Sequence, residues 1–348
     1  MSKIILLDRI DNLAEDALFK AIHAMMVRGY DLPAPAQYKV LTAGLINQTY
    51  DVDNCWIIQH VNPIFGRQVN DDIAALTQIL SEHQVPVPHM VRAKNGDYCV
   101  DGEDYGLPAG PWRVMTKLPG DTCHFVGSVE QIRSLAVMMS RFHGALNQVR
   151  YTFKHTRPGV HDFRRHYKAL DEAVETHREH RLYAKVAALY DRIQHDMRFV
   201  KDDNVMSCED LRIIHGDPKI SNFLFEAGTI VGVVDLDTMA KSRVAFDMGD
   251  AIRSWCNPHP EDVEPAFDRE YAREAMGLYL ENAGFLTKAE RASLTEAAPF
   301  ITLELAMRFA RDALCEDYFG FNPEIGHGEH SLMRAQSMTT LCEQMLAC

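Results

Sequence analysis

Apolar side chains recur along the chain at two different spacings. Short runs with extended alternation are concentrated in the first 118 residues, whereas long stretches with helical spacing dominate the remainder. The extended runs are 38–42, 50–52, 55–62 and 112–118, and the stretches with helical spacing are 11–27, 70–83, 129–146, 266–283 and 288–317. This pattern predicts an α+β protein with a small β-rich part and a larger, mostly helical part.

The chain of 348 residues is longer than one ordinary hydrophobic core requires, and it suits two lobes. The extended run at 112–118 leads into Pro119 and Gly120, which end a strand and suit a connection between lobes. We therefore predict a first lobe over residues 1–118 and a second lobe over residues 119–348.

The strongest chemical signal lies between residues 213 and 237. Asp217 and Asn222 stand five positions apart in a polar loop after an apolar run, and Asp235 ends the buried strand predicted for residues 230–234. Transfer of a phosphoryl group requires a carboxylate that orients the acceptor hydroxyl, oxygen ligands for a divalent cation and a nearby positive charge. We assign these roles to Asp217, to Asn222 with Asp235, and to Lys219. The alternative is a His-Gly-Asp turn followed by an amphipathic hairpin.

His215-Gly216-Asp217 with Asn222, followed by Val234-Asp235-Leu236-Asp237, resembles the catalytic and metal loops of the aminoglycoside phosphotransferase family, which is distantly related to protein kinases. The resemblance implies a two-lobed, protein-kinase-like α+β fold, with the nucleotide phosphates and hinge in the first lobe and the catalytic and metal loops in the second. It also implies an ATP- and Mg²⁺-dependent kinase for a small molecule with a hydroxyl acceptor. A nucleotide-binding regulatory protein that has lost catalysis is the alternative.

Two segments of the first lobe are candidates for nucleotide binding. Gly44, Asn47 and Thr49 lie in a turn between two strands, where kinases fold a loop over the phosphates. Met115 and Lys117 lie at the predicted hinge, where kinases bind adenine through backbone groups. The alternatives are an ordinary hairpin and a plain interlobe linker.

The predicted third strand departs from the kinase pattern because it has no lysine for the phosphates. Gln59 and His60 stand there, and the helix that follows offers no obvious mid-helix acidic partner. A subgroup of the family that includes N-acetylhexosamine 1-kinases resembles residues 46–50 and 56–65, and it often has an arginine where this chain has His60. His60 is therefore a candidate phosphate ligand or a plain strand residue.

The acceptor is predicted from the same subgroup, which residues 307–309 and 317–319 also resemble. A sugar hydroxyl, such as the anomeric hydroxyl of an N-acetylhexosamine, is the favoured acceptor, and choline, homoserine and aminoglycosides stay open. Our candidate acceptor contacts are Asp237, Glu304, Arg308 and Asp317. Glu304, Arg308 and Asp312 recur every four residues, so the alternative is a run of salt bridges along one helix.

Several polar residues are assigned supporting or structural roles. His215 belongs to the catalytic loop, and Asp247 is expected to cap a helix that opens near residue 246 and to brace that loop. The histidines at 155, 161, 166 and 177 lie among arginines and are interpreted as a solvated face, with phosphate contact as the alternative. His327 to His330 is interpreted as the start of a helix.

Charge and cysteine usage limit the possible partners and compartment. The formal net charge of −13 argues against binding to nucleic acid or to an anionic membrane surface. The eight cysteines show no paired spacing, as expected for reduced thiols in a cytoplasm. The apolar run at residues 4–7 is too short for a signal sequence, and Asp8 interrupts it. We expect a cytoplasmic protein whose oligomeric state the sequence leaves open.

Overall fold

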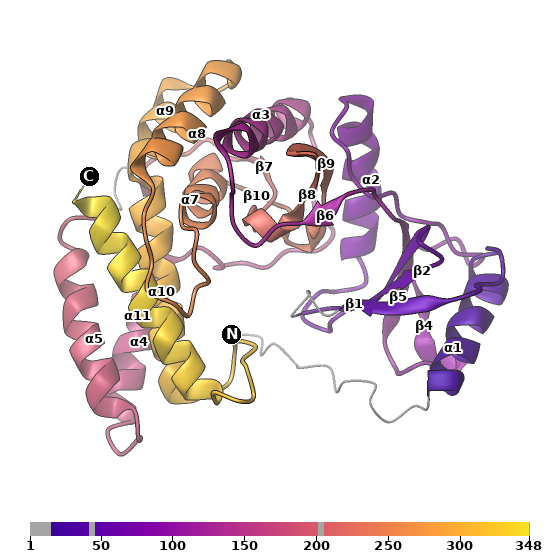
Figure 1. Ribbon diagram of the computed structural model, residues 1–348, viewed down its shortest axis with the longest axis horizontal. Helices are drawn as coiled ribbons and strands as arrows, with labels where there is room; N and C mark the ends of the chain where they lie inside the picture. Colours follow the sequence, from indigo (N-terminus) through magenta and orange to yellow (C-terminus); the bar gives the residue numbers. More distant parts are fainter. Residues whose placement is uncertain (1–14, 42–45, 201–204, 348) are drawn as a thin grey trace. The chain divides into compact units, whose positions relative to one another are not determined.

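The computed structural model describes residues 15–41, 46–200 and 205–347. The chain separates into two compact units (Figure 1). Unit 1 comprises residues 1–119 and 151–156, and unit 2 comprises residues 120–150 and 157–348.

Unit 1 is built on an antiparallel sheet with the strand order β1-β2-β3-β5-β4. Its strands are β1 (Tyr38–Leu41), β2 (Gln48–Val52), β3 (Trp56–His60), β4 (Val100–Asp101) and β5 (Pro111–Thr116), and its helices are α1 (Glu15–Ala24), a π-helical turn (Met25–Gly29), α2 (Val69–Glu82) and a 3₁₀ turn (Gly102–Tyr105). The described part of the helix predicted for 11–27 changes at Met25 from α-helical to π-helical geometry. Residues 11–14 lie outside the described residues.

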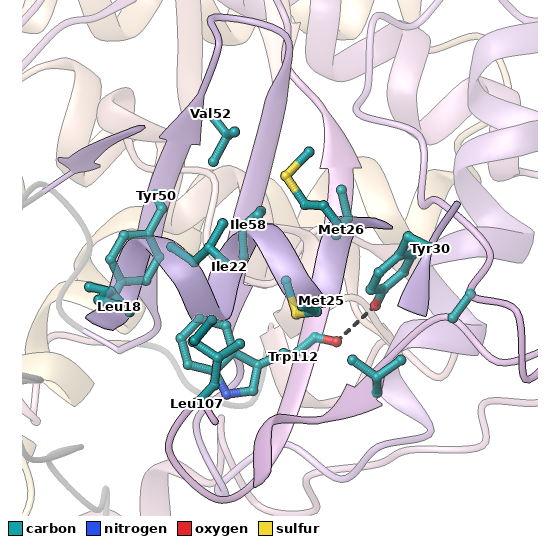
Figure 2. Close-up of a cluster of buried hydrophobic side chains, with 14 residues drawn as sticks. Leu18, Ile22, Met25, Met26, Tyr30, Tyr50, Val52, Ile58, Leu107 and Trp112 are labelled. Atoms are coloured by element: carbon teal, nitrogen blue, oxygen red, sulfur yellow. Dashed lines mark hydrogen bonds between the residues drawn. The ribbon is translucent and has the colours of Figure 1, made fainter. Parts of the chain in front are cut away.

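The apolar core of unit 1 lies between α1 and one face of the sheet (Figure 2). Side chains alternate between the two faces of a strand, so Tyr50, Ile58 and Trp112 point to the same side from three neighbouring strands. The Tyr30 hydroxyl donates a hydrogen bond of 2.8 Å to the Trp112 carbonyl, which fastens the end of the π-helical turn to β5.

Residues 151–156 belong to unit 1 because Asp72 on α2 holds them. Its carboxylate accepts hydrogen bonds from the Tyr151 hydroxyl at 2.7 Å and from the backbone N–H groups of Lys154 and His155 at 2.9 Å each. Asp72 itself is buried. This segment falls in the second lobe predicted from the sequence, because contacts between residues 79 to 83 positions apart leave no local signal.

Unit 2 is mostly helical and contains two small antiparallel sheets, β6-β8-β9 and β10-β7 (Figure 1). Its helices are α3 (Val129–Leu146), α4 (Phe163–Thr176), α5 (Tyr183–Asp196), α7 (Val244–Trp255), α8 (Arg269–Asn282), α9 (Lys288–Ser293), α10 (Ala297–Cys315) and α11 (His327–Leu346). Its strands are β6 (Asp121–Thr122), β7 (Arg212–Ile214), β8 (Phe223–Glu226), β9 (Thr229–Val233) and β10 (Ala240–Ser242). Helix α10 packs against α11, α7, α4 and α5, and most of its side chains are buried.

The helices of unit 2 agree only partly with the predicted ranges. Helix α3 matches its predicted range, and Ser128 caps it by accepting a hydrogen bond from the Gln131 N–H. The single helix predicted for 288–317 is instead α9, a 3₁₀ turn (Leu294–Glu296) and α10. Pro299, which has no N–H to donate, fits only in the first turn of a helix, so α10 starts two residues before it. None of the described helices combines the length and the apolar composition that a membrane-spanning segment needs.

Candidate active site

The catalytic loop follows β7, which pairs with β10 inside unit 2. The chain reverses at Gly216, whose φ of 85° lies in the left-handed region. A Cβ atom at this position would lie 2.3 Å from the Thr238 carbonyl oxygen. This conformation favours glycine, and the close approach to Thr238 leaves no room for a Cβ atom.

Three predicted site residues come together in this loop. The Lys219 ammonium lies 2.6 Å from Asp217 Oδ2, and the Asn222 side-chain N–H donates to the Asp217 carbonyl at 2.7 Å and to Asp217 Oδ2 at 3.3 Å. Because the amide nitrogen of Asn222 faces Asp217, its oxygen Oδ1 is the atom that can hold a cation.

The charge state of the Asp217–Lys219 pair follows from its surroundings. Burial raises the pKa of the Asp217 carboxyl, but the Lys219 charge and hydrogen bond outweigh it, so the pKa lies below its usual value. Burial lowers the pKa of Lys219, but the Asp217 and Asp235 carboxylates raise it by more, so this pKa lies above its usual value. Both groups are therefore ionised. The Asp217 side chain is 26% exposed and the Lys219 side chain is 39% exposed, so both also reach solvent.

Asp235 is placed beside Asn222 by the β8–β9 hairpin. The Val234 N–H donates to the Asn222 carbonyl at 2.9 Å, and Asp235 follows with a φ of 62° at the start of the 3₁₀ turn Leu236–Thr238. Asp235 reaches solvent, yet the surrounding protein displaces part of the water from its carboxyl group, and this desolvation raises the pKa. The Lys219 charge lowers the pKa of Asp235, and the nearby Asp217 carboxylate raises it. A bound cation would relieve this destabilised charge.

The donor atoms at this site fit a magnesium ion that is shared with a nucleotide. Among the described residues, no group of three histidine, cysteine, aspartate or glutamate side chains could hold a metal alone. The Asn222 amide oxygen and the Asp235 carboxylate are a mixed oxygen pair, which leaves positions for phosphate oxygens and water. Mg²⁺ is commonly held in this way, by one or two protein groups plus phosphates.

Asp247 on α7 anchors the backbone of the catalytic loop. Its carboxylate accepts hydrogen bonds from the His215 N–H at 2.7 Å and the Gly216 N–H at 2.8 Å. His143 Nε2 donates to the same carboxylate at 3.0 Å, and His143 Nδ1 lies 2.9 Å from the Tyr279 hydroxyl. Burial raises the pKa of Asp247, but the His143 hydrogen bond leads the effects that bring it below its usual value.

Asp247 does not cap α7, contrary to the predicted helix start near residue 246. The N-cap is Arg243, so Asp247 lies inside the first turn, where its carboxylate is free to turn toward the loop. The carboxylate at this end of the helix also faces the positive end of the helix dipole.

Other side chains that support the loop have no sequence motif. The Trp255 indole N–H donates to the Pro218 carbonyl at 2.9 Å, and the Ser254 hydroxyl accepts from the Ile220 N–H at 3.0 Å. The His215 ring is fully buried, with Nε2 donating to the Val234 carbonyl at 3.0 Å. No spacing rule separates such residues from ordinary helix side chains, so sequence reasoning missed Trp255 and Ser254.

In unit 1, two of the residues predicted to form the phosphate loop make hydrogen bonds to other residues of the same unit. Gly44 lies outside the described residues. Asn47 Oδ1 accepts a hydrogen bond from the Asn62 N–H at 2.9 Å, and the Thr49 hydroxyl accepts from Gln59 Nε2 at 3.0 Å. These bonds shape the turn before β2 and connect it to β3 and the residues after it.

His60 is part of the core of unit 1, which contradicts its assignment as a phosphate ligand. Its ring stacks on Trp112 at 4.8 Å and is 3% exposed, and Nε2 donates to the Ala109 carbonyl at 3.0 Å. Burial lowers the pKa of His60, so the ring is neutral. His60 shares the face of β3 with Ile58, and the plain strand interpretation is the one that the structure supports.

The opposite face of the sheet carries a buried arginine that sequence reasoning overlooked. Arg113 on β5 donates through Nε and Nη2 to Gln59 Oε1, at 2.9 and 2.5 Å, and through Nη1 to Asn70 Oδ1 on α2 at 3.2 Å. A cation therefore stands one strand away from the position at which kinases have the strand lysine. The sequence alone does not reveal this arginine, because Arg113 comes to lie beside Gln59 only when β5 pairs with β3 in the folded sheet.

The hinge residues are also engaged within unit 1. The Lys117 N–H donates to the Cys55 carbonyl at 2.9 Å, and the Lys117 ammonium pairs with Asp51 at 2.6 Å and contacts Asn54. Met115 lies opposite Ile57 in the sheet. The Lys117 N–H is thus unavailable to a base, and the predicted backbone contact would have to come from its neighbours.

The residues predicted to contact the acceptor all lie in unit 2. Those on α10 do not form the run of salt bridges that was the alternative. Glu304 accepts from His161 Nδ1 at 3.0 Å, Arg308 lies over the rings of Tyr318 and Phe319, and Asp317 pairs with Arg311. Asp237 is buried in the turn after Asp235. Among the described residues, no ion pair joins Glu304, Arg308 and Asp312 along the helix, so the salt-bridge alternative is wrong.

The histidines at 161 and 166 also differ from their interpretation as a solvated face. His166 is 5% exposed, and the His161 side chain is 17% exposed. Helix α4 packs against α10, which turns this end of α4 into the interior of unit 2.

Unit 1 is built on a five-stranded sheet, and unit 2 is mostly helical and contains the catalytic loop and the candidate metal ligands. This combination defines a kinase-like phosphotransferase. A profile of the phosphotransferase enzyme family matches residues 37–281, and the chain belongs to that family. The predicted phosphotransferase activity on a hydroxyl group is confirmed at this level.

Solved structures of several kinases share the fold, which confirms the predicted protein-kinase-like α+β class. A microcompartment-associated aminopropanol kinase is 17% identical, with a TM-score of 0.64 and coverage of 94% of this chain and 97% of that one. Amicoumacin kinase in complex with AMP-PNP, Ca²⁺ and Ami is 16% identical, with a TM-score of 0.61 and coverage of 95% and 94%. The GDP complex of aminoglycoside 2'-phosphotransferase-IIIa is 16% identical, with a TM-score of 0.57 and coverage of 93% and 96%.

Proposed function

We propose that this protein is an ATP- and Mg²⁺-dependent kinase that transfers the γ-phosphoryl group to a hydroxyl of a small molecule. The observation that carries the proposal is the convergence of Asp217, Lys219, Asn222 and Asp235 within one loop and hairpin of unit 2. Similar folds hold AMP-PNP or GDP, which supports a nucleotide cosubstrate and leaves the choice of base to experiment.

The ionised Asp217 carboxylate would accept a hydrogen bond from the acceptor hydroxyl, orient its oxygen toward the phosphorus and take its proton as the new bond forms. Lys219, held 2.6 Å from Asp217, would lie near the equatorial oxygens and stabilise their charge. Asn222 Oδ1 and the Asp235 carboxylate would hold Mg²⁺, which supplies charge neutralisation of the triphosphate. Asp247 would keep the loop backbone in position for all of them.

The acceptor that we favour is a sugar hydroxyl, as in N-acetylhexosamine 1-kinases. The resemblance of residues 307–309 and 317–319 supports this choice, with Asp237, Glu304, Arg308 and Asp317 as candidate contacts. The kinases of similar fold act, by their names, on aminoglycosides, amicoumacin and aminopropanol, so other alcohols are alternatives. A panel of sugars, amino alcohols and aminoglycosides, assayed for acceptor-dependent ADP release, would decide between them.

The test of the proposed catalytic role is Asp217→Asn. Loss of the base should lower kcat by about 10²- to 10⁴-fold, because the amide cannot take the proton. The melting temperature should change little, since the side chain is partly exposed and keeps its size. Steady-state kinetics with the best acceptor and differential scanning calorimetry measure the two effects.

Asp191→Asn, at an exposed aspartate of α5, is the matched control and should leave kcat unchanged. Near-normal turnover in Asp217→Asn would refute the assignment. A wild-type protein that binds MgATP but releases no ADP with any acceptor would instead support the catalytically inactive, regulatory alternative.

A further inference from the structure

Three polar side chains stand in one row across the sheet of unit 1. Thr49 on β2 pairs with Gln59 on β3, and Gln59 pairs with Arg113 on β5. The residues beside them on the strands, such as Ile58 and Trp112, belong to the apolar core under α1 (Figure 2). Because side chains alternate along a strand, the polar row lies on the opposite face of the sheet.

Hydrogen bonds run along this row in one direction. Arg113 Nε and Nη2 both donate to Gln59 Oε1, at 2.9 and 2.5 Å, and Gln59 Nε2 donates to the Thr49 hydroxyl at 3.0 Å. A guanidinium group can only donate, so the oxygen of the Gln59 amide must face Arg113 and its NH₂ group must face away. The Thr49 hydroxyl makes only a long bond to the Asn47 carbonyl, at 3.4 Å.

The row passes from a buried cation to donors that solvent can reach. Arg113 is 2% exposed, and its Nη1 donates to Asn70 on α2 at 3.2 Å. Gln59 and Thr49 are partly exposed. The second N–H of Gln59 has no acceptor among the described residues. Since hydrogen bonds in a chain polarise one another, the buried charge strengthens the two partly exposed donors.

The position of the row corresponds to the phosphate anchor of kinases. There, a lysine on the third strand contacts the α and β phosphates and pairs with a helix glutamate. Here Gln59 stands on the third strand, the cation is Arg113 on the neighbouring strand, and α2 provides the neutral Asn70. The row ends at Thr49, beside the turn at which kinases fold a loop over the phosphates.

We infer that Gln59 and Thr49 bind the phosphates of the nucleotide and that Arg113 is the positioning residue that replaces the strand lysine. The inference rests on the proposed kinase function and adds how the phosphates are held. Phosphate oxygens would accept hydrogen bonds from the second N–H of Gln59 and from the Thr49 hydroxyl. Arg113 fixes the amide, because a Gln59 side chain turned by 180° would present its oxygen to the phosphate and repel it.

The first test is Gln59→Glu, which separates phosphate binding from a structural role. A carboxylate keeps the acceptor that Arg113 needs, so the melting temperature should not fall, but it has no N–H for a phosphate. Isothermal titration calorimetry with Mg²⁺ should show affinity for ADP lowered on the order of tenfold or more, with affinity for adenosine unchanged. GDP and guanosine replace these probes if the protein binds guanine more tightly.

Gln78→Glu, at an exposed glutamine of α2, is the matched control for the added negative charge and should bind both probes like the wild type. Equal affinities of the wild type and Gln59→Glu for the diphosphate would overturn the inference. An equal loss for the nucleoside would also overturn it, because the phosphates would then not be the group that Gln59 recognises.

The second test moves the charge back to the third strand. Arg113→Gln should weaken binding of the diphosphate by a similar factor, and Gln59→Lys in the same chain should restore it. A purely structural arginine would not be rescued by a lysine at position 59, so an absence of rescue would refute the positioning role. Should Arg113→Gln fail to fold, Gln59→Glu decides alone.

The same titrations separate this inference from the proposed function. If the wild type binds nucleotide and phosphorylates an acceptor while Gln59→Glu binds the diphosphate normally, the kinase assignment stands and only the phosphate anchor falls. A wild type that binds neither nucleotide would refute both.

Discussion

At the scale of single residues, the candidate site depends on two positions in the left-handed region. Gly216 has a φ of 85°, and Asp235 has a φ of 62°. Glycine adopts this conformation without strain, and aspartate is among the few other residues that tolerate it. The backbone at Asp235 is held there between the Val234–Asn222 hydrogen bond and the 3₁₀ turn that follows. The strain is thus found where a metal-binding carboxylate is proposed.

The metal role of Asp235 can be tested without disturbing this backbone. Asparagine also tolerates the left-handed region, so Asp235→Asn should fold normally while losing the charge that holds Mg²⁺. We expect weaker binding of ATP in the presence of Mg²⁺ and unchanged binding in its absence, as measured by isothermal titration calorimetry. Equal affinities of the wild type and the variant for MgATP would count against a metal role.

At the scale of elements, α7 is the helix that positions the catalytic loop. Asp247 in its first turn holds the backbone of His215 and Gly216, whereas Ser254 and Trp255 at its other end hold Ile220 and Pro218. The loop is therefore supported at both ends by one rigid element. Helices α3 and α8 extend the support through His143 and Tyr279, which line up behind the Asp247 carboxylate.

Removing the Tyr279 hydroxyl, which is the last member of this chain of hydrogen bonds, should measurably weaken the support of the catalytic loop. Burial raises the pKa of Tyr279 well above its usual value, so the phenol stays protonated and donates to His143. Tyr279→Phe should lower the free energy of unfolding by about 1 kcal/mol, as typical for one buried hydrogen bond, and should also lower kcat. Urea denaturation and steady-state kinetics measure the two effects.

Tyr271→Phe, at a less buried tyrosine of the same helix, is the matched control. If Tyr279→Phe behaves like this control in both measurements, the support of the loop through Asp247 does not extend to α8.

At the scale of the whole molecule, a carboxylate ties three segments of unit 2 together. Glu261, in the connection between α7 and α8, lies 2.9 Å from Arg253 on α7 and 2.6 Å from Arg334 on α11. Arg253 also pairs with Asp250 at 2.8 Å. The last helix of the chain is thereby joined to the helix that supports the catalytic loop.

This network predicts a pH dependence of stability. Burial raises the pKa of Glu261, but Arg334 and Arg253 outweigh it and lower the pKa from 4.5 to about 2. A carboxyl whose pKa is depressed by folding stabilises the folded state above its unfolded pKa, and the stabilisation is lost as the pH falls toward the folded value. Glu261 should therefore contribute fully above pH 4.5 and progressively less between 4.5 and about 2.

The check is the free energy of unfolding across this acidic range in the wild type and in Glu261→Gln. The variant should be less stable near neutral pH and should lose less stability on acidification. Glu264→Gln, at an exposed neighbour, should follow the wild-type curve. Parallel curves for the wild type and Glu261→Gln would show that the arginine pair does not bias the titration of this carboxyl.

Much of the catalytic loop could be predicted because its residues are close along the chain. Asp217, Lys219 and Asn222 occupy one loop, and a single hairpin returns Asp235 to Asn222, so motif spacing is a fair guide to their geometry. Helix α3 was also predictable, since a periodic apolar stripe and a serine cap mark it locally.

The support around that loop was not predictable, because its partners are distant in sequence. His143 lies 104 positions from Asp247 and 136 from Tyr279, and Arg113 lies 54 positions from Gln59. Alternation along β3 shows that Gln59 and His60 point to opposite faces, but not which face is covered by α1. The resemblance to a subgroup with arginine at this position made His60 a candidate phosphate ligand or a plain strand residue, and only the folded sheet shows that it belongs to the core.

By itself, then, the sequence determined the class of the protein and singled out the candidate reacting groups, because these depend on local spacing and periodicity. Only the tertiary structure decided which faces are buried and which side chains hold the loop. Those properties depend on contacts between residues far apart in the chain, and such contacts exist only when the helices and strands have packed.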